Sequence, residues 1–227
     1  MRDLILHEQF ELEALSRLQS GRLLANLIFG GGTMLRLCHG LDRYSVDLDF
    51  WAVKKIEWAK FYQRMEKHLL KFYKLTDSAN KHFTLLFELK SEQYPRSLKI
   101  EIRKEQKAIK TDTCIAYSPN STVQVLMKTV ALEDMMKSKI EAFLSRAEIR
   151  DAYDMEFLLK KAVPLIADKA TIGRLLTALE KLGKKDFTVK LGTLLESSRR
   201  QYYAEHKFRI LETHLRDRLR ADDPLGG

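Results

Sequence analysis

The spacing of apolar residues changes near residue 130, and this change constrains the fold more than any other feature of the sequence. Before it, apolar and polar residues alternate strictly in stretches such as 83–89 and 98–102. A period of two is typical of half-buried β-strands. After it, apolar residues recur every three or four positions, which is the period of an α-helix. The sequence therefore predicts mixed α and β structure up to about residue 130 and only helices beyond it.

This reading predicts an α+β protein with two domains. In the first part we expect helices at 4–22 and 54–75, a short helix within 33–39, and strands at 47–50, 83–89, 98–102 and 123–127. The apolar run 23–29 fits a buried strand, or the end of a helix followed by one. In the second part we expect helices at 131–145, 149–162, 170–182, 188–198 and 199–220. The predicted domains are 1–130 and 131–220, followed by a disordered tail at 221–227.

Composition excludes several classes of protein. Hydrophobic residues make up 45% of the chain and charged residues 31%, with ten Gly and four Pro, so a disordered or collagen-like chain is excluded. No apolar run approaches the ~18 residues of a membrane span, and the first residues lack the order of a secretory signal. Cys38 and Cys114 are too few for a disulfide framework or a zinc site. We therefore expect a soluble cytoplasmic protein with no membrane partner.

The net charge of +9 permits a polyanionic partner such as RNA or a nucleotide. Residues 1–120 contain 20 basic and 15 acidic residues, and residues 121–227 contain 20 and 16. The excess is spread over the chain without a basic arm. Many basic proteins are merely soluble, so the charge alone does not require such a partner.

Three consecutive glycines, Gly30, Gly31 and Gly32, followed by Thr33, form the first candidate site. Successive glycines are costly unless the backbone needs conformational freedom or close approach. A Gly-Gly-Thr turn at the start of a helix presents backbone N–H groups that suit a phosphate. Taken alone, these glycines favour a tight turn without a ligand.

Asp47 and Asp49 favour a ligand-binding site over a simple tight turn. On a strand, residues i and i+2 point to the same face, so the two carboxylates lie side by side. Their mutual repulsion is relieved when a cation lies between them, and magnesium is the usual cation for carboxylate oxygens. The alternative is a pair of solvent-exposed acids on an edge strand. The combination of the glycine turn with two acids fourteen and sixteen residues after Thr33 favours the metal site.

Glu101, on the polar face of the strand 98–102, is a candidate third acid, although a polar residue there fits any half-buried strand. The order of glycine turn, DxD strand and later acid resembles the polymerase-beta-like nucleotidyltransferase fold. The fuller stretches GGTMLRL (31–37) and RYSVDLDF (43–50) are similar to the AbiEii/AbiGii nucleotidyltransferase toxin family. The third acid of many nucleotidyltransferases is Asp, and this chain has Glu.

A second block supports the resemblance. The segments KIEAFLSR (139–146) and RDAYDM (150–155) are similar to later segments of that family, and the resemblance covers about residues 20–160. Lys139 falls on the apolar face of its helix, where a lysine is rare unless it is paired, binds a ligand or snorkels to water. Asp151 and Asp154 would by themselves be read as helix N-terminal acids. The resemblance implies that Asp151 is an active-site acid.

The resemblance implies a fold and a set of residue roles. The expected fold is a nucleotidyltransferase domain with a mixed sheet and flanking helices, and a helical domain that completes the active-site cleft. Asp47, Asp49 and Glu101 would bind one or two Mg²⁺ ions, with Glu101 also a candidate base. Gly31, Gly32 and Thr33 would hold the β- and γ-phosphates of an NTP, and Lys139 would neutralise them. Arg43 and Ser45 would bind phosphate or brace the metal strand.

The same resemblance implies a toxin of a toxin–antitoxin or phage-defence system, with a cognate antitoxin as partner. The expected reaction transfers a nucleoside monophosphate from an NTP to RNA, at the 3′ end of tRNA, and so inhibits translation. Transfer to a protein or a small molecule is an alternative, as is an NTP-binding regulator that transfers nothing. The intact DxD pair argues against the regulator, because binding alone needs no paired carboxylates.

Overall fold

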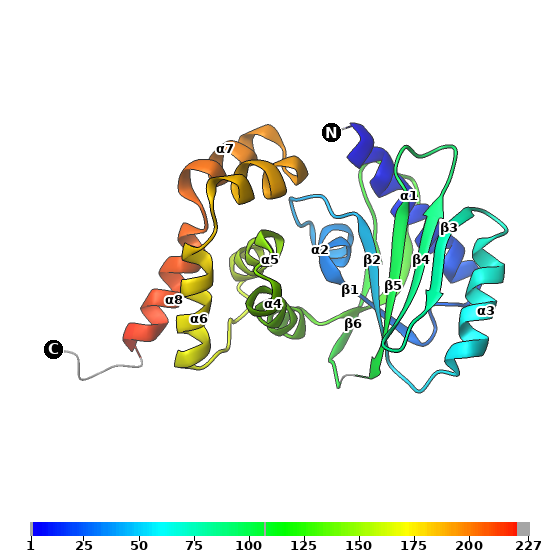
Figure 1. Ribbon diagram of the computed structural model, residues 1–227, viewed down its shortest axis with the longest axis horizontal. Coiled ribbons are helices and arrows are strands. Elements are labelled where there is room, and N and C mark those ends of the chain that lie inside the picture. The colour runs from blue at the N-terminus through cyan, green and yellow to red at the C-terminus, as the bar shows by residue number, and fades with distance from the viewer. Residues whose placement is uncertain (1, 107, 222–227) are drawn as a thin grey trace. The chain divides into compact units, whose positions relative to one another are not determined.

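The computed structural model describes residues 2–106 and 108–221. The chain divides into two compact units, Met1–Ala131 and Leu132–Gly227. The first unit is a mixed sheet with flanking helices and the second is helical (Figure 1), which confirms the predicted fold class. Of the predicted disordered tail, Ala221 is the last residue of a helix, and residues 222–227 lie outside the described part of the chain.

The first unit is built around a single seven-stranded sheet. In chain order its elements are α1 (Arg2–Ser20), β1 (Leu27–Gly30), α2 (Gly31–His39), β2 (Asp47–Ala52), α3 (Trp58–Leu69), β3 (Lys74–Asn80), β4 (Thr84–Lys90), β5 (Leu98–Gln106), β6 (Thr111–Ala116) and β7 (Val125–Val130). The strand order is β3-β4-β5-β2-β1-β7-β6. Strand β2 pairs with β5 in parallel and β1 pairs with β7 in parallel, whereas the other neighbours are antiparallel.

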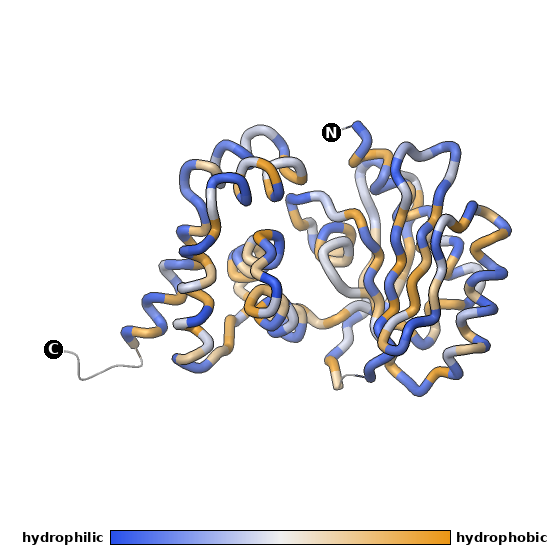
Figure 2. The backbone as a smooth tube through the Cα atoms, in the orientation of Figure 1, coloured by the Kyte–Doolittle hydropathy of each residue, from blue (hydrophilic) through white to orange (hydrophobic). Residues whose placement is uncertain are grey.

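The core of this unit comes from the apolar positions of the central strands. Along these strands hydrophobic and hydrophilic residues alternate, as Figure 2 shows in orange and blue. One face is closed to solvent and its members are Leu48, Phe50, Leu85, Phe87, Leu89, Leu98, Ile100 and Ile102. Phe83, which the alternation placed in a strand, lies just before β4 and is 75% exposed. The alternate positions of the same strands are therefore left for polar residues.

Two strands, β3 and β6, were not predicted from the sequence. The helix predicted at 54–75 is shorter in the structure, where α3 ends at Leu69 and β3 follows it. Strand β6 precedes β7. Strands β3 and β6 are the two edges of the sheet. Their side chains are mostly exposed or half-exposed. Because neither strand buries a complete face, neither carries the alternating pattern on which the prediction relied.

The second unit contains the helices α4 (Leu132–Arg146), α5 (Ile149–Lys160), α6 (Lys169–Glu180), α7 (Ser197–His206) and α8 (Arg209–Ala221). The predicted helix 188–198 is wrong: a π-helical turn, Asp186–Leu191, and a 3₁₀ turn, Gly192–Leu194, occupy this region. The predicted helix 199–220 is two helices. Lys207 separates them with φ of 50°, outside the helical range, so the backbone turns there. None of the described helices combines the length and apolar character needed to cross a bilayer.

Candidate functional site

The predicted carboxylates of β2 and β5 share one face of the sheet. The parallel register aligns Asp47 with Lys99 and Asp49 with Glu101. Aligned residues on neighbouring strands project from the same side, whereas the residues between them point to the buried face. Asp47, Asp49 and Glu101 are only partly buried. The fold thus brings the three predicted acids to adjacent positions on the polar face.

Lys99, which the sequence reading did not single out, lies among these acids. Its Nζ is 3.1 Å from Oε2 of Glu101. Burial by itself lowers the pKa of Lys99, but the hydrogen bond and charge of Glu101, with the charges of Asp47 and Asp49, raise it above its ordinary value. The ammonium therefore remains charged and neutralises part of the acidic face.

The glycine turn begins helix α2 directly against β2. Gly31 has φ of 74°, which a residue with a side chain rarely adopts. A Cβ placed on Gly31 would lie 2.2 Å from Oδ2 of Asp49. The absence of a side chain at position 31 lets the backbone approach the second carboxylate of the DxD pair. Both the backbone conformation and the close approach require glycine here.

The neighbouring glycines are required by other contacts. A Cβ on Gly32 would lie 2.5 Å from Nη2 of Arg43 and 2.8 Å from Oγ of Ser45, so both predicted residues pack against this turn. Arg43 is buried and donates to the carbonyl of Tyr44 at 2.9 Å. The roles predicted for Arg43 and Ser45, phosphate binding or bracing of the metal strand, stay predictions. A Cβ on Gly30 would lie 1.5 Å from the ring of Trp51, which explains the third glycine.

Thr33 links the glycine turn to β2, the predicted metal-binding strand. Its side chain is fully buried, and Oγ1 donates to the carbonyl of Asp47 at 2.6 Å. The same hydroxyl lies 3.4 Å from Oε1 of Glu11. Its role in phosphate binding stays a prediction. The contacts of this hydroxyl are with the protein, so a phosphate contact from Thr33 would come from its backbone N–H.

A buried polar cluster on α1 was missed by the sequence reading. Its members are His7, Glu8 and Glu11, each at most 2% exposed. His7 Nε2 lies 3.0 Å from the carbonyl of Val46, next to the DxD strand. Glu8 contacts Arg36 of α2 and the hydroxyl of Ser118. The sequence did carry a signal, because Glu8 and Glu11 interrupt the helical stripe of Leu4, Leu15 and Leu18 at the spacing of that stripe.

Burial shifts the pKa of two members of this cluster, Glu11 and His7. Burial, followed by the charge of Glu8, raises the pKa of Glu11 well above its ordinary value. Burial likewise lowers the pKa of His7, although its hydrogen bond to Val46 opposes the shift. Each group is thus biased towards its neutral form, because removal from water penalises charge. Glu8, the third member of the cluster, is instead paired with Arg36 of α2.

A pocket of about 670 Å³ opens beside Asp47 in the first unit. Its walls come from α1, from strands β2 to β5 and from the loop between β4 and β5. Lys99 and Arg96 contribute positive charge, and Asp47, Asp77 and Glu88 contribute negative charge. The pocket gives the predicted metal strand an adjoining space of mixed charge.

The second predicted block forms a buried ionic cluster in the helical unit. Lys139 of α4 lies 2.7 Å from Oδ2 of Asp154 and 3.2 Å from Oδ1 of Asp151. Arg146 also binds Asp151 through both carboxylate oxygens, at 2.8 and 2.9 Å. The two aspartates are fully buried and Lys139 nearly so. Lys139 is thus a paired lysine rather than one that reaches water alone, and its contact with Asp154 is the shorter of the two.

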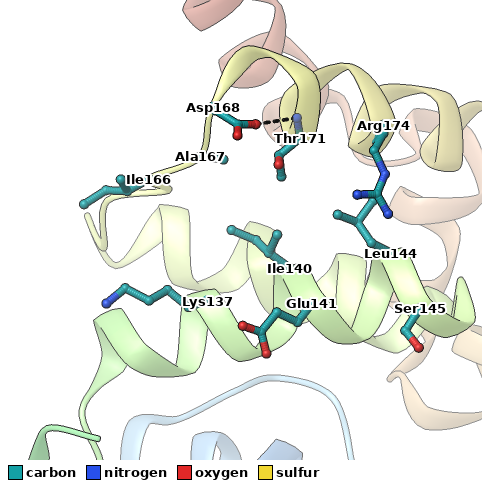
Figure 3. Close-up of a pocket in the computed structure, with 10 residues that line it drawn as sticks. All are labelled: Lys137, Ile140, Glu141, Leu144, Ser145, Ile166, Ala167, Asp168, Thr171 and Arg174. Carbon is teal, nitrogen blue, oxygen red and sulfur yellow. Dashed lines mark hydrogen bonds between the residues drawn. The ribbon is translucent and has the colours of Figure 1, made fainter. Parts of the chain in front are cut away.

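The helical unit also has a pocket of about 560 Å³ between α4 and α6, with contributions from the segment before α6 (Figure 3). Ile140 and Leu144 of α4 lie opposite Thr171 and Arg174 of α6, and Lys137 and Glu141 line the rim on the α4 side. Asp168 accepts a hydrogen bond from the Thr171 N–H at 2.7 Å and so caps α6. None of the predicted catalytic residues is among those that line this pocket.

The side chains as they stand do not form a finished metal site. Among the described residues, no three His, Cys, Asp or Glu side chains converge closely enough to hold a metal ion. The backbone register places Asp47, Asp49 and Glu101 appropriately, but a Glu101 oxygen is engaged by Lys99. The donor chemistry suits a divalent cation, and Glu101 would have to release Lys99 before joining such a site.

A crystal structure from Helicobacter pylori shares this fold. Over 96% of this chain and 98% of the other, the protein is similar to the crystal structure of JHP933 from Helicobacter pylori, with 18% identity and a TM-score of 0.55. MenT4, a nucleotidyltransferase toxin from Mycobacterium tuberculosis, aligns over 95% of this chain and 92% of its own, with 14% identity and a TM-score of 0.49. None of the curated proteins matches the sequence.

The family assignment rests on the sequence as a whole. The model of the nucleotidyl transferase AbiEii toxin family, of type IV toxin–antitoxin systems, matches residues 13–223. The match includes the glycine turn, the DxD strand, Glu101 and the Lys139 cluster, and thus confirms the resemblance read from the two sequence blocks. The chain belongs to the AbiEii family of nucleotidyltransferase toxins.

Proposed function

We propose that this nucleotidyltransferase uses Mg²⁺ to transfer a nucleoside monophosphate from an NTP to RNA, at the 3′ end of tRNA. The observation that carries the proposal is the alignment of Asp49 with Glu101, next to Asp47 and in contact with the turn at Gly31. A nucleotidyltransferase must hold a triphosphate and stabilise the charge that develops on it. The glycine turn would hold the triphosphate, and the acids would bind the cation that stabilises the developing charge. Both lie in the first unit of the fold.

The residues present suit a divalent cation in their chemistry. Carboxylate oxygens are the protein ligands that Mg²⁺ prefers, and Asp47 and Asp49 offer them from one strand face. Glu101 is the proposed third acid, once it has left Lys99. A bound Mg²⁺ would neutralise the phosphate oxygens and lower the pKa of the attacking hydroxyl.

The turn at the start of α2 is the proposed triphosphate cradle. Helix α2 begins at Gly31, so the N–H groups of Gly31, Gly32 and Thr33 lack intrahelical acceptors. The helix dipole adds positive potential at the same end. Arg43 and Ser45 support the turn by packing against Gly32. The β- and γ-phosphates would then lie next to the carboxylates that serve the α-phosphate.

The reaction that we propose is a displacement at the α-phosphorus. The oxygen of an RNA hydroxyl forms a bond to this phosphorus, and the bond from phosphorus to the bridging oxygen of the β-phosphate breaks. Pyrophosphate leaves with the electron pair of that bond. The hydroxyl proton passes to a carboxylate, for which Glu101 is the candidate when it does not serve as a ligand.

Lys139 and Asp151 enter the proposal as further residues of the reaction. The ammonium of Lys139 would neutralise charge on the triphosphate. Asp151 would orient the Lys139 side chain through the 3.2 Å contact between them. Asp154 holds the same ammonium. The buried ion pairs with Asp151 and Asp154 hold the Lys139 ammonium in a fixed position.

The RNA acceptor is supported by charge. Forty basic residues against 31 acidic ones give the chain a net charge that favours a polyphosphate partner. A toxin of a type IV system has an antitoxin partner, which we propose is encoded with it.

The test incubates the purified protein with Mg²⁺, total tRNA and each α-³²P-labelled NTP in turn. The expected result is label on tRNA that depends on one or two NTPs. The double variant Asp47→Ala/Asp49→Ala should lose this label, whereas Asp112→Ala, at an exposed acid on the edge strand β6, should keep it.

Other outcomes would redirect the proposal. Label on protein instead of tRNA would replace the acceptor and keep the chemistry. NTP binding without transfer of label to any acceptor would contradict the transferase mechanism. Transfer that survives in the double variant would remove Asp47 and Asp49 from the reaction.

A further inference from the structure

Lys99 is surrounded by carboxylates on the polar face of the sheet. Asp47 is aligned with it on β2, and Glu88 is aligned with it on β4. On its own strand, Glu101 accepts a hydrogen bond from its Nζ at 3.1 Å. The Glu88 carboxylate is itself held by the hydroxyl of Ser97 at 2.6 Å, so Glu101 is the acid with which Lys99 forms its ion pair.

The position of Lys99 conflicts with that of a divalent cation. A cation bound by Asp47, Asp49 and Glu101 needs oxygens of all three acids, and an oxygen of Glu101 faces the ammonium of Lys99. Two positive charges at such close range repel each other. The Lys99 side chain is 44% exposed, so it is free to turn towards solvent when it is displaced.

We propose that Lys99 is an internal counter-ion that holds Glu101 before a divalent cation binds, and that the cation displaces it. This inference rests on the proposed metal site. Lys99 is then a positioning residue that acts through Glu101. It keeps the three acids from repelling one another in the metal-free protein, and it sets how much divalent cation is needed to complete the site.

The proposal predicts a gain of affinity when the lysine is removed. Lys99→Met keeps the aliphatic stem but removes the charge, so Glu101 is released and the competing cation is gone. We expect Mn²⁺, used as a paramagnetic probe, to bind this variant about fivefold more tightly or better, as expected for removal of one nearby like charge. The measurement is the EPR signal of free Mn²⁺ during titration of the full chain.

Three further variants make the measurement specific. Lys128→Met removes the same charge from an exposed position on β7 and should bind Mn²⁺ as the wild type does, within about twofold. Lys99→Arg retains a cation and should restore an affinity close to that of the wild type. Asp47→Ala/Asp49→Ala should abolish tight binding, which tests the metal site itself.

Thermal unfolding gives a second readout that does not depend on catalysis. In EDTA, Lys99→Met should melt below the wild type, because Glu101 then lacks the counter-charge that Lys99 supplies. Saturating Mn²⁺ should raise its melting temperature by more than it raises that of the wild type. If Lys99→Met is too unstable to purify, Lys99→Gln serves in both measurements, with the same expected direction.

The outcomes separate the two proposals. Wild-type binding that the double aspartate variant abolishes, together with unchanged or weaker binding by Lys99→Met, would overturn the role of Lys99 and leave the metal site intact. Binding that survives in the double variant would overturn the proposed metal site, and the role of Lys99 with it.

Discussion

At the scale of single residues, the site depends on how closely backbone and carboxylate approach each other. Gly31 lies against Asp49, and no other residue fits without a shift of one or the other. His7 of α1 contacts the carbonyl of Val46 just before the strand of Asp47 and Asp49, and Glu11 of α1 contacts Thr33. The proposed site therefore leaves no room for an added methyl group at position 31.

Gly31→Ala should lower both stability and nucleotide transfer. The new Cβ collides with the Asp49 carboxylate, and φ of 74° is unfavourable for alanine, so we expect a loss of about 1–3 kcal/mol in the free energy of unfolding. Urea denaturation and the labelling assay measure the two effects. The control is Gly173→Ala in α6, where nothing lies within 4 Å of the new Cβ and a gain of about 0.5–1 kcal/mol is expected. A fully stable and active Gly31→Ala protein would contradict the role of the close approach.

Glu11→Gln should change how stability depends on pH. The pKa of Glu11 is raised by burial, so in the wild type the folded state keeps a proton that the unfolded state releases. Its contribution is fully present below the unfolded pKa and is lost as pH rises towards the folded pKa, with a slope of up to about 1.4 kcal/mol per pH unit. Gln cannot ionise, so the variant should lose this part of the slope and gain relative stability as pH rises. Denaturant titrations across the pH range test this, and parallel pH profiles of the two proteins would refute it.

At the scale of elements, the site depends on how α2, β2 and β5 are joined. Helix α2 is tied to β2 through the hydroxyl of Thr33, and β2 is tied to β5 through parallel pairing. The central strands were predictable because each buries a complete apolar face. The pairing of Asp49 with Glu101 was not, since alternation reveals which face a residue takes but not which strand is its neighbour.

Thr33→Val should weaken the junction between α2 and β2. The variant keeps the shape but leaves the carbonyl of Asp47 without this buried donor, and we expect a loss of about 1–3 kcal/mol in stability. Transfer should fall as well, because the turn and the acids then lose their fixed spacing. Thr33→Ser retains the hydroxyl and should lie between Val and the wild type. Equal stability of the Ser and Val variants would show that the hydrogen bond contributes little.

At the scale of the whole molecule, both the positive charge and the match to the family model extend over most of the chain rather than one motif. The positive excess is spread over both halves of the sequence, and the family match extends over residues 13–223. The sequence predicted the fold class and the residues of the two blocks. It did not reveal Lys99, because a lysine on an exposed strand face has no distinctive pattern, nor that Lys139 pairs with both Asp151 and Asp154. Those facts depend on strand and helix neighbours that no local spacing encodes.

Transfer to tRNA should fall steeply with salt. If phosphate contacts bind the acceptor, counterion release makes the logarithm of its affinity fall linearly with the logarithm of salt concentration. We expect the KM for tRNA to rise between about 50 and 200 mM NaCl while the kcat changes little. Rates at varied tRNA concentration and fixed, saturating NTP measure this. A KM that is insensitive to salt would contradict an electrostatic acceptor surface.

The parallel pairing of β2 with β5 also has a consequence for synthesis of the protein. Asp49 and Glu101 are neighbours in the sheet but about fifty residues apart in the chain, so their pairing is a non-local contact. A ribosome must extend the chain past β5 before the third acid can reach its place, and past β7 before β1 gains its second neighbour. The emerging polypeptide therefore carries the glycine turn and both aspartates well before it can assemble a complete acidic face. During that interval the nascent chain lacks the strand that carries the proposed third acid, Glu101.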